Sequence, residues 1–309
     1  MSRSKNETQF RRWTRFVILA LIVVAVASLG LIKIGSYVGD SRAVRVVAAE
    51  NFWGNIAQQI GGNQVGVTSV ITNPNADPHL YESDAHDAIA VADANVVIEN
   101  GLGYDDFMNK LVSASPNSSR QIVQVASVLK VTGQEANPHL WYDTPQIPIV
   151  AAQMAAVFAT KDPAKSALFT SNLRVFDASL EPIIELLAKI KQEYAGTPVA
   201  YTERVPGYLL ANAGLIVKTP VGFSSAIEDG VDPSPADTYD MDRLLKDRKV
   251  RVLLYNAQTV SPVTQQVRQL ARQENIPVVA VTETMPAGDS YQSWQLDQLQ
   301  SLEHALNER

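Results

Sequence analysis

The sequence predicts an α/β fold of two lobes, each with a mostly parallel sheet flanked by helices, joined by one long linking helix. Short β-branched strands alternate with helical stretches after residue 43, in two series that are separated by a single long helical pattern. Strands that are apolar on both faces are typical of parallel sheets covered by helices. The alternating order predicts right-handed crossovers between neighbouring parallel strands.

The first series predicts an N-terminal lobe over residues 43–160, and the second predicts a C-terminal lobe over residues 197–309. In the first lobe we expect a helix over Ser83–Ala92, with Ser83 as its N-cap, because a serine hydroxyl can accept from the first free N–H groups. The predicted strands, in chain order, are Val44–Ala48, Val65–Ile71, Val96–Glu99, Ile122–Val125, Val199–Thr202, Leu215–Lys218, Val250–Tyr255 and Val278–Val281.

The linking helix is predicted over residues 163–195. Apolar residues recur there at steps of three and four from Leu173 to Tyr194, which defines one stripe along the helix. Pro163 suits the first turn and Gly196 suits the position just past the end, whereas Pro182 predicts a kink. At about 1.5 Å per residue the helix would be roughly 50 Å long, enough to run behind both lobes.

The N-terminus has the layout of an export signal. Residues 1–15 carry five basic side chains, and residues 16–34 are mostly apolar. Cleavage at Ala25-Val26-Ala27 would remove the segment, whereas retention would leave a short membrane anchor. Because basic residues stay in the cytoplasm, both outcomes place the rest of the chain outside it, in the periplasm or at the outer face of the cytoplasmic membrane.

Composition excludes several classes of function. The net charge is −6 and charged residues make up 19% of the chain, which argues against a nucleic-acid-binding surface of clustered Lys and Arg. The chain has no cysteine, so thiolate zinc sites, disulfides, cysteine catalysis and an acylated-cysteine anchor are excluded.

Two histidines lie in closely similar settings. His79 stands in Asp77-Pro78-His79-Leu80 after one predicted strand, and His139 stands in Asn137-Pro138-His139-Leu140-Trp141 after another. Ligands of open α/β sheets bind beyond the carboxyl ends of the strands. Glu203 and Glu283 follow two strands of the second series at equivalent places. The first half would supply two imidazoles and the second half two carboxylates. Together these four groups would coordinate and neutralise a divalent cation.

Each of these candidate residues, and each of the remaining ones, also has a simpler interpretation. A single Pro-His in a loop is usually a solvated or turn residue, and Glu203 and Glu283 could be carboxylates at helix N-termini. His86 and His304 lie in predicted helices and are interpreted as solvated. Asp289 precedes the last helix and is predicted to be its N-cap, but it remains a rival to Glu283 as fourth ligand.

The chain from about residue 44 onward resembles the metal-binding solute-binding proteins of ABC importers for zinc and manganese, the cluster A-I type. The segments that carry the resemblance are Ala48-Ala49-Glu50-Asn51-Phe52-Trp53, Asp77-Pro78-His79, Asn137-Pro138-His139-Leu140-Trp141-Tyr142-Asp143, Thr202-Glu203-Arg204-Val205-Pro206-Gly207-Tyr208, Pro233-Ser234-Pro235 and Gly288-Asp289-Ser290-Tyr291.

The resemblance implies a monomeric protein that binds a metal ion between its lobes and delivers it to an ABC permease in the cytoplasmic membrane. It implies His79, His139 and Glu203 as ligands, with Glu283 at a place where the family usually has Asp. Glu at the third position resembles the manganese-type members, and carboxylate oxygen suits Mn²⁺ better than imidazole does. Zinc nevertheless lies above manganese in the Irving–Williams order, and Fe²⁺ is a further candidate.

Three other functions stay open at the level of sequence. A metal-dependent hydrolase would need an open coordination position and a general base, and the chain has no His-Glu-x-x-His or Gly-x-Ser-x-Gly motif. We therefore do not expect an enzyme. An adhesion protein of the same fold would use the metal as a structural staple. A binding protein for an organic solute would have an aromatic-lined pocket and bind without metal.

Overall fold

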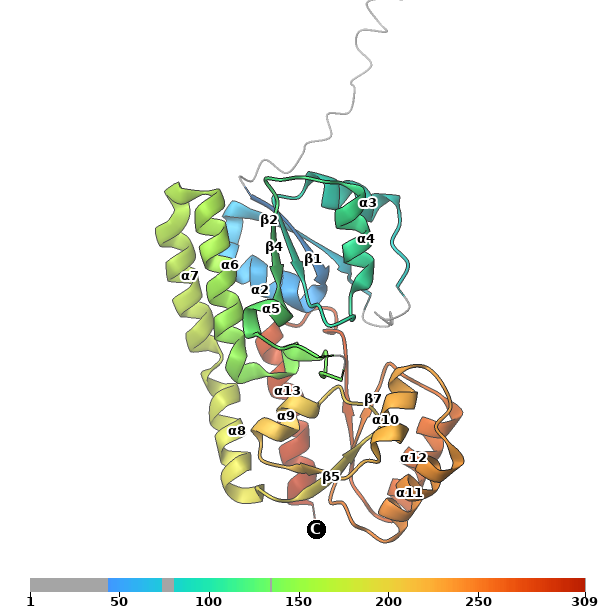
Figure 1. Cartoon of the computed structure of the whole chain (residues 1–309). Coiled ribbons are helices and arrows are strands. Elements are labelled where there is room, and N and C mark those ends of the chain that lie inside the picture. The colour runs from blue at the N-terminus through green and yellow to red at the C-terminus, as the bar shows by residue number, and fades with distance from the viewer. Residues whose placement is uncertain (1–43, 74–80, 134, 309) are drawn as a thin grey trace, which may run out of the picture. The chain divides into compact units, whose positions relative to one another are not determined.

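In the part of the chain that the structure describes, two four-stranded parallel sheets form the frame (Figure 1). The computed structural model describes residues 44–73, 81–133 and 135–308, all within one compact unit. The N-terminal sheet has the order β2-β1-β3-β4 and the C-terminal sheet has the order β6-β5-β7-β8. All the strand pairs are parallel, which confirms the predicted fold class. The strands are β1 (Val44–Glu50), β2 (Val65–Ile71), β3 (Val96–Glu99), β4 (Gln121–Gln124), β5 (Pro198–Tyr201), β6 (Ile216–Val217), β7 (Leu253–Asn256) and β8 (Val278–Val281).

Side chains that alternate along β1 separate two hydrophobic layers of the N-terminal lobe. Val46 and Ala48 face one layer, and Val47 and Ala49 face the other, as the period of a strand requires. The first layer is covered by α2 (Asn51–Gly61), α6 (Ile147–Lys161) and α7 (Ser166–Ser179), and the second by α3 (Ala85–Asp93) and α4 (Asp106–Ala114).

The C-terminal sheet is covered in the same way. Helices α8 (Glu181–Tyr194) and α13 (Tyr291–Asn307) pack together on one side. On the other side, a separate apolar cluster forms between the sheet and α10 (Val221–Glu228), α11 (Pro235–Lys246) and α12 (Pro262–Gln273). Two short helices, α5 (Val125–Leu129) and α9 (Gly207–Asn212), lie in the connections of the two lobes.

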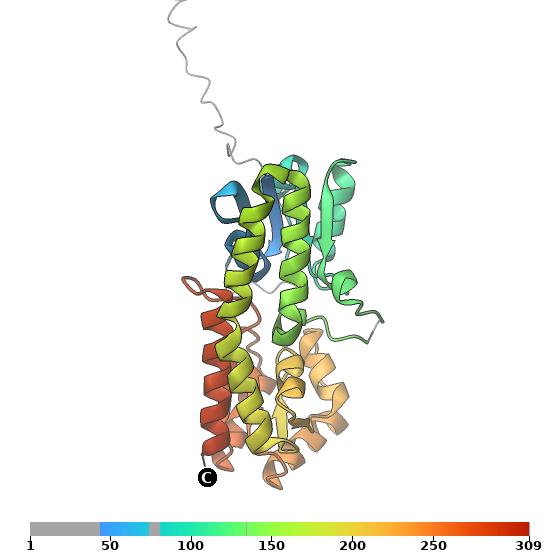
Figure 2. The same ribbon diagram turned by 90° about the vertical axis from the view of Figure 1, so that its left-hand side faces the viewer.

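The predicted linking helix is two helices in succession. Helix α7 ends at Ser179 and α8 begins at Glu181, with Pro182 in the first turn of α8. The proline has no N–H to donate to the preceding turn, so the helix is interrupted there instead of merely kinked. Helix α7 packs on α2 of the N-terminal lobe, whereas α8 packs on α13 of the C-terminal lobe. Figure 2 shows the two helices running one after the other along both lobes.

An aromatic cluster joins the two lobes into one continuous core. Phe52 of α2 stacks on Trp141, with ring centroids 4.4 Å apart, and lies 5.9 Å from Trp294 of α13. Tyr142 contacts Trp294 at 5.9 Å and donates a hydrogen bond to the Thr282 carbonyl at 2.7 Å. Phe52, Trp141 and Trp294 are almost completely buried. The lobes therefore share an apolar interior behind the facing edges of their sheets.

Two predicted helix caps are wrong. Helix α3 is capped by Asp84, not Ser83, because Asp84 and Asp87 form a reciprocal capping box. Helix α13 is capped by Ser290, not Asp289, because Ser290 forms a capping box with Ser293. In both cases the side chain one residue further along reaches the third helical residue, the spacing that a capping box requires.

Residues 1–15 and 16–34, predicted to be a basic n-region and a signal peptide or anchor, lie outside the described residues. Among the residues that are described, the helices are too short or too polar to span a bilayer.

Replacing Phe52 by Ala should reduce the free energy of unfolding by about 3–5 kcal/mol, because the cavity would open between tightly packed aromatic rings. Urea unfolding followed by circular dichroism measures the loss. The control is Ile122→Ala, whose side chain is 49% exposed on β4 and should matter little. Equal losses in the two variants would contradict a core shared between the lobes.

Candidate metal centre

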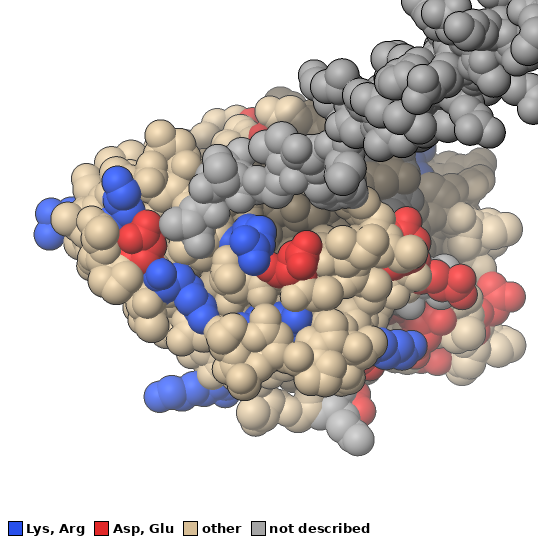
Figure 3. Space-filling model, turned by 90° about the horizontal axis from the view of Figure 1, so that it is seen from above, with Lys and Arg blue, Asp and Glu red and all other residues tan. Residues whose placement is uncertain are grey.

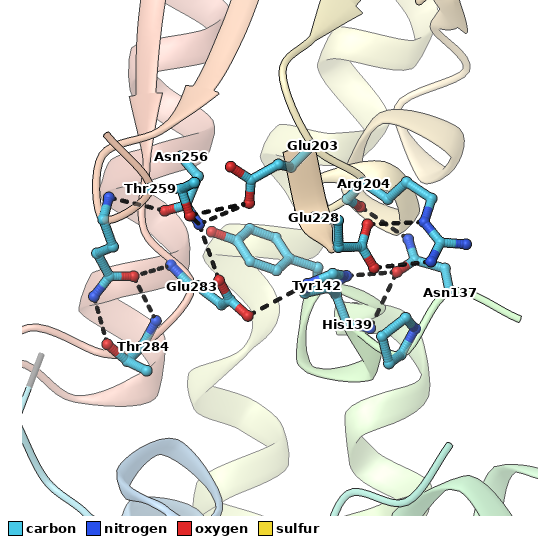
Figure 4. Close-up of polar contacts among 12 residues, drawn as sticks. Asn137, His139, Tyr142, Glu203, Arg204, Glu228, Asn256, Thr259, Glu283 and Thr284 are labelled. Atoms are coloured by element: carbon cyan, nitrogen blue, oxygen red, sulfur yellow. Dashed lines mark hydrogen bonds and ion pairs between the residues drawn. The ribbon is translucent and has the colours of Figure 1, made fainter. Parts of the chain in front are cut away.

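Three neighbouring strands of the C-terminal sheet place polar side chains at one edge. Glu203 follows β5, Asn256 ends β7 and Glu283 follows β8, and the three residues are at most 4% exposed. The Asn256 amide donates to Glu203 Oε2 at 3.0 Å and to Glu283 Oε2 at 2.9 Å (Figure 4). One amide group thus bridges the two predicted carboxylate ligands.

Residues of the loop after β7 hold these carboxylates in place. Gln258 Oε1 accepts hydrogen bonds from the backbone N–H groups of Glu283 at 2.5 Å and of Thr284 at 3.0 Å. The Thr259 hydroxyl donates to Glu203 Oε2 at 3.3 Å. Outer contacts of this kind orient metal-binding side chains in proteins.

His139 is completely buried and faces Glu283. Its Nδ1 lies 2.6 Å from Asn137 Oδ1, and since that oxygen can only accept, Nδ1 carries the proton. In the neutral ring, Nε2 then has a free lone pair, and it lies 3.6 Å from Glu283 Oε1. A histidine whose second ring nitrogen is fixed by an amide oxygen has the orientation of a metal ligand.

The loop that carries His139 is bound to the C-terminal lobe, although it belongs to the N-terminal half of the sequence. Asn137 donates to the Arg204 carbonyl at 2.9 Å, and Tyr208 donates to the Asn137 carbonyl at 2.9 Å. Gly207 permits this approach, because a Cβ there would lie 2.7 Å from the Asn137 amide nitrogen. The structure therefore positions His139 together with Glu203 and Glu283.

Burial dominates the electrostatics of the site. Desolvation, together with the charge of Glu283, raises the pKa of Glu203 to about 8, although hydrogen bonds from Asn256 and Thr259 oppose the shift. Asp105 also has a pKa raised to about 7, mainly by burial. The nearby Arg204 guanidinium donates two hydrogen bonds to the Glu228 carboxylate, both at 2.8 Å, so its charge is paired there. Clustered carboxylates in a low-dielectric interior favour a bound cation.

The three predicted ligands are close but do not yet surround one point. Of the residues that the structure describes, His139, Glu203 and Glu283 do not bring one donor atom each within 4.8 Å of one another. The Asn256 amide occupies the space between the two carboxylates, so binding an ion would require local adjustment of these side chains. The fourth predicted ligand, His79, lies outside the described residues.

The alternative candidates lie elsewhere. Asp289 is half-buried beside the cap of α13, where it accepts from the Ser293 hydroxyl at 3.5 Å. His304 is exposed on α13, 3.4 Å from Glu308, and His86 is exposed on α3. His86 lies close to the exposed Asp84 and the buried Asp87, whose carboxylates already make the capping box of α3. In Figure 3, which looks down on the molecule from above, acidic side chains gather on the right-hand side of the view.

Asn256 was not among the residues singled out from the sequence. Its signal was its position, because Asn256 ends β7 at the same sheet edge as Glu203 and Glu283. The rule that ligands bind beyond the carboxyl ends of parallel strands applies to it equally.

Comparisons with known proteins identify the family. Residues 46–305 match the sequence model of the family described as "Zinc-uptake complex component A periplasmic". The chain belongs to this family. The family consists of binding components of metal transport and not of enzymes, so the hydrolase alternative is excluded. Membership also confirms the predicted location outside the cytoplasm.

Some distant relatives match over nearly the whole chain. The metal ABC transporter substrate-binding lipoprotein FimA of Streptococcus parasanguinis is 24% identical and covers 91% of this chain and 96% of its own length. The manganese ABC transporter substrate-binding lipoprotein ScaA of Streptococcus gordonii is 22% identical and covers 94% and 98%. Both are lipoproteins, whereas this chain has no cysteine that could be acylated.

Solved structures share the fold. The periplasmic zinc-binding protein TroA of Treponema pallidum superposes with a TM-score of 0.72 at 19% identity, covering 86% of this chain and 99% of its own. The binding protein FpvC of Pseudomonas aeruginosa, solved in complex with Mn²⁺, has a TM-score of 0.71 at 21% identity and covers 85% and 98%.

Replacing Asn256 by Ala should raise the pKa of Glu203 above about 8, because the amide hydrogen bond favours the ionised carboxylate. Carbon-detected NMR of glutamate side chains measures the titration in the metal-free protein. Asn212→Ala is the control, since Asn212 donates to Asp143 instead, at 2.9 Å. A pKa of Glu203 that stays the same in Asn256→Ala would contradict the bridging role of the amide.

Proposed function

We propose that this protein binds one divalent transition-metal ion, Mn²⁺ or Zn²⁺, through His79, His139, Glu203 and Glu283, and delivers it to an ABC permease. The family is that of metal-binding components of ABC transporters. The observation that carries the ligand assignment is the buried His139 Nε2, unprotonated in the neutral ring, 3.6 Å from Glu283 Oε1. Glu203 is linked to the same group through Asn256.

The donor types bear on the choice of metal. Glu203 and Glu283 supply carboxylate oxygen, which suits Mn²⁺, whereas imidazole donors suit Zn²⁺ as well as other transition metals. The manganese-binding names of several relatives support the first ion, and the zinc-uptake description of the family supports the second. Because the affinity order of divalent metals favours zinc at most N/O sites, supply in the cell must contribute to selection.

The ligand assignment predicts that His79→Ala combined with His139→Ala abolishes tight, stoichiometric metal uptake. The measurement is calorimetric titration of metal-free full-length protein with Mn²⁺ and with Zn²⁺. His86→Ala combined with His304→Ala is the matched control, because both of these side chains are exposed. Wild-type affinity in the first double variant would refute the assignment.

Metal affinity should rise with pH up to about 8. Glu203 holds its proton below that value, and the ion must displace the proton before the carboxylate can bind. The proton of Glu203 alone should make the apparent dissociation constant fall about tenfold per pH unit below pH 8, and this contribution should level off above that value. Metal titrations between pH 6 and about 9 in one buffer series test this. In Glu203→Gln, the dissociation constant should depend less steeply on pH, because the Glu203 contribution is lost.

A further inference from the structure

A third carboxylate faces the proposed metal site from the other lobe. Glu50 ends β1, a central strand of the N-terminal sheet, and its side chain is 0% exposed. The next residue, Asn51, is bonded to the backbone of Met285, donating to its carbonyl at 2.7 Å and accepting from its N–H at 3.3 Å. This pair of contacts fixes the end of β1 against the loop that carries Glu283.

The surroundings of Glu50 are acidic. Its pKa is raised well above the ordinary value, first by burial and then by the charges of Asp105, Glu99 and Glu283. Tyr104 lies close to both Glu50 and Glu283, whose charges help to raise its pKa, and it makes a side-chain hydrogen bond to Glu283. Glu50 and Glu283 therefore approach the same small region from opposite lobes.

The simplest structural explanation for Glu50 does not hold. Glu50 occupies the N-cap position of α2, where a carboxylate commonly accepts from the first N–H groups of a helix, but its side chain makes no capping hydrogen bond. Among the described residues, neither of its carboxylate oxygens forms a hydrogen bond with another residue, and its own backbone N–H is the group that opposes the rise in its pKa.

Protonation alone does not satisfy this group. A neutral carboxylic acid still carries an O–H that needs an acceptor, and an ionised one needs donors or a cation. Leaving either form unpaired in the interior costs free energy, so natural proteins seldom retain such a group without a function. A cation held between the lobes would supply the missing partner.

We propose that the Glu50 carboxylate is a further oxygen ligand of the bound ion, supplied by the N-terminal lobe, and that it makes the site favour Mn²⁺ over Zn²⁺. This inference rests on the proposed function. With Glu50, the described residues offer carboxylates from Glu50, Glu203 and Glu283 and one imidazole from His139. Oxygen-rich sets of this kind suit Mn²⁺, whereas zinc is usually held by four ligands that often include several imidazoles.

The test compares Glu50→Gln with Glu99→Gln in full-length protein stripped of metal by a chelator. Glu99 is the matched control: it ends the neighbouring strand β3, is also buried with a raised pKa, but accepts a hydrogen bond from Gln124 at 2.8 Å. Mn²⁺ and Zn²⁺ affinities are measured by competition with a chromophoric chelator, and thermal unfolding is followed without metal.

Glu50→Gln should weaken Mn²⁺ binding by more than about 100-fold, since loss of an outer-shell partner alone costs about 10–100-fold. Zn²⁺ binding should weaken less, and Glu99→Gln should change neither. Without metal, Glu50→Gln should unfold at about the same temperature as wild type, because the carboxylate has no hydrogen-bond partner among the described residues that the substitution could break. Glu50→Asp retains the charge on a shorter side chain and should bind Mn²⁺ with intermediate affinity.

Unchanged Mn²⁺ affinity in Glu50→Gln, or an equal loss for both ions, would overturn this inference. The inference would also fail if metal-free Glu50→Gln unfolded at a lower temperature than wild type and Glu50→Asp recovered none of the Mn²⁺ affinity. Wild-type protein that takes up neither ion would instead refute the proposed function. Wild-type binding that requires Glu203 and Glu283 but not Glu50 would refute the role of Glu50 alone.

Discussion

The shared aromatic core is the constraint on which the rest of the structure depends. Phe52, Trp141 and Trp294 come from three distant segments and pack behind the facing edges of the two sheets. Because cores of this density resist deformation, the two edges are held at a nearly fixed separation. Carboxylates at the ends of β5, β8 and β1 are thereby kept out of water and close to one another.

This arrangement puts the stability of the metal-free protein in conflict with metal binding. Burial shifts Glu203 and Glu50 toward their neutral forms, so the metal-free protein keeps protons where a cation could be bound. Perturbed acids that cluster in this way are typical of functional sites, and proteins commonly sacrifice stability to maintain them. The Asn256 amide moderates the conflict, since it donates to both Glu203 and Glu283 within a rigid strand end.

Much of the architecture could be predicted from the sequence. The strands are apolar on both faces and bounded by polar turns, so β2, β3 and β8 were predicted with the bounds that the structure shows. The caps of α3 and α13 were displaced by one residue, because adjacent Ser and Asp residues compete for the same N–H groups and only the three-dimensional geometry decides between them. Pro182 marked the place of the break between α7 and α8, although the sequence predicted a kink there and not an interruption.

The candidate site was predicted less completely. Glu203, Glu283 and His139 could be found from their positions after strands, and the structure brings them near one another. Asn256 has the same position after a predicted strand, but an amide there has an ordinary explanation, and so does a glutamate before a helix, which is the position of Glu50. What distinguishes them is which groups they contact, or fail to contact, across segments far apart in the chain.

The docking of the His139 loop onto the C-terminal lobe has a consequence for how the chain can be divided. A polypeptide that ended after α6 would contain the 135–142 loop but would lose Arg204, Tyr208 and Trp294, against which the loop and its aromatic residues pack. A polypeptide that began at β5 would expose the apolar side of α13. Neither half would therefore keep its packing without the other, and no single cut in the chain separates the two lobes of the folded protein.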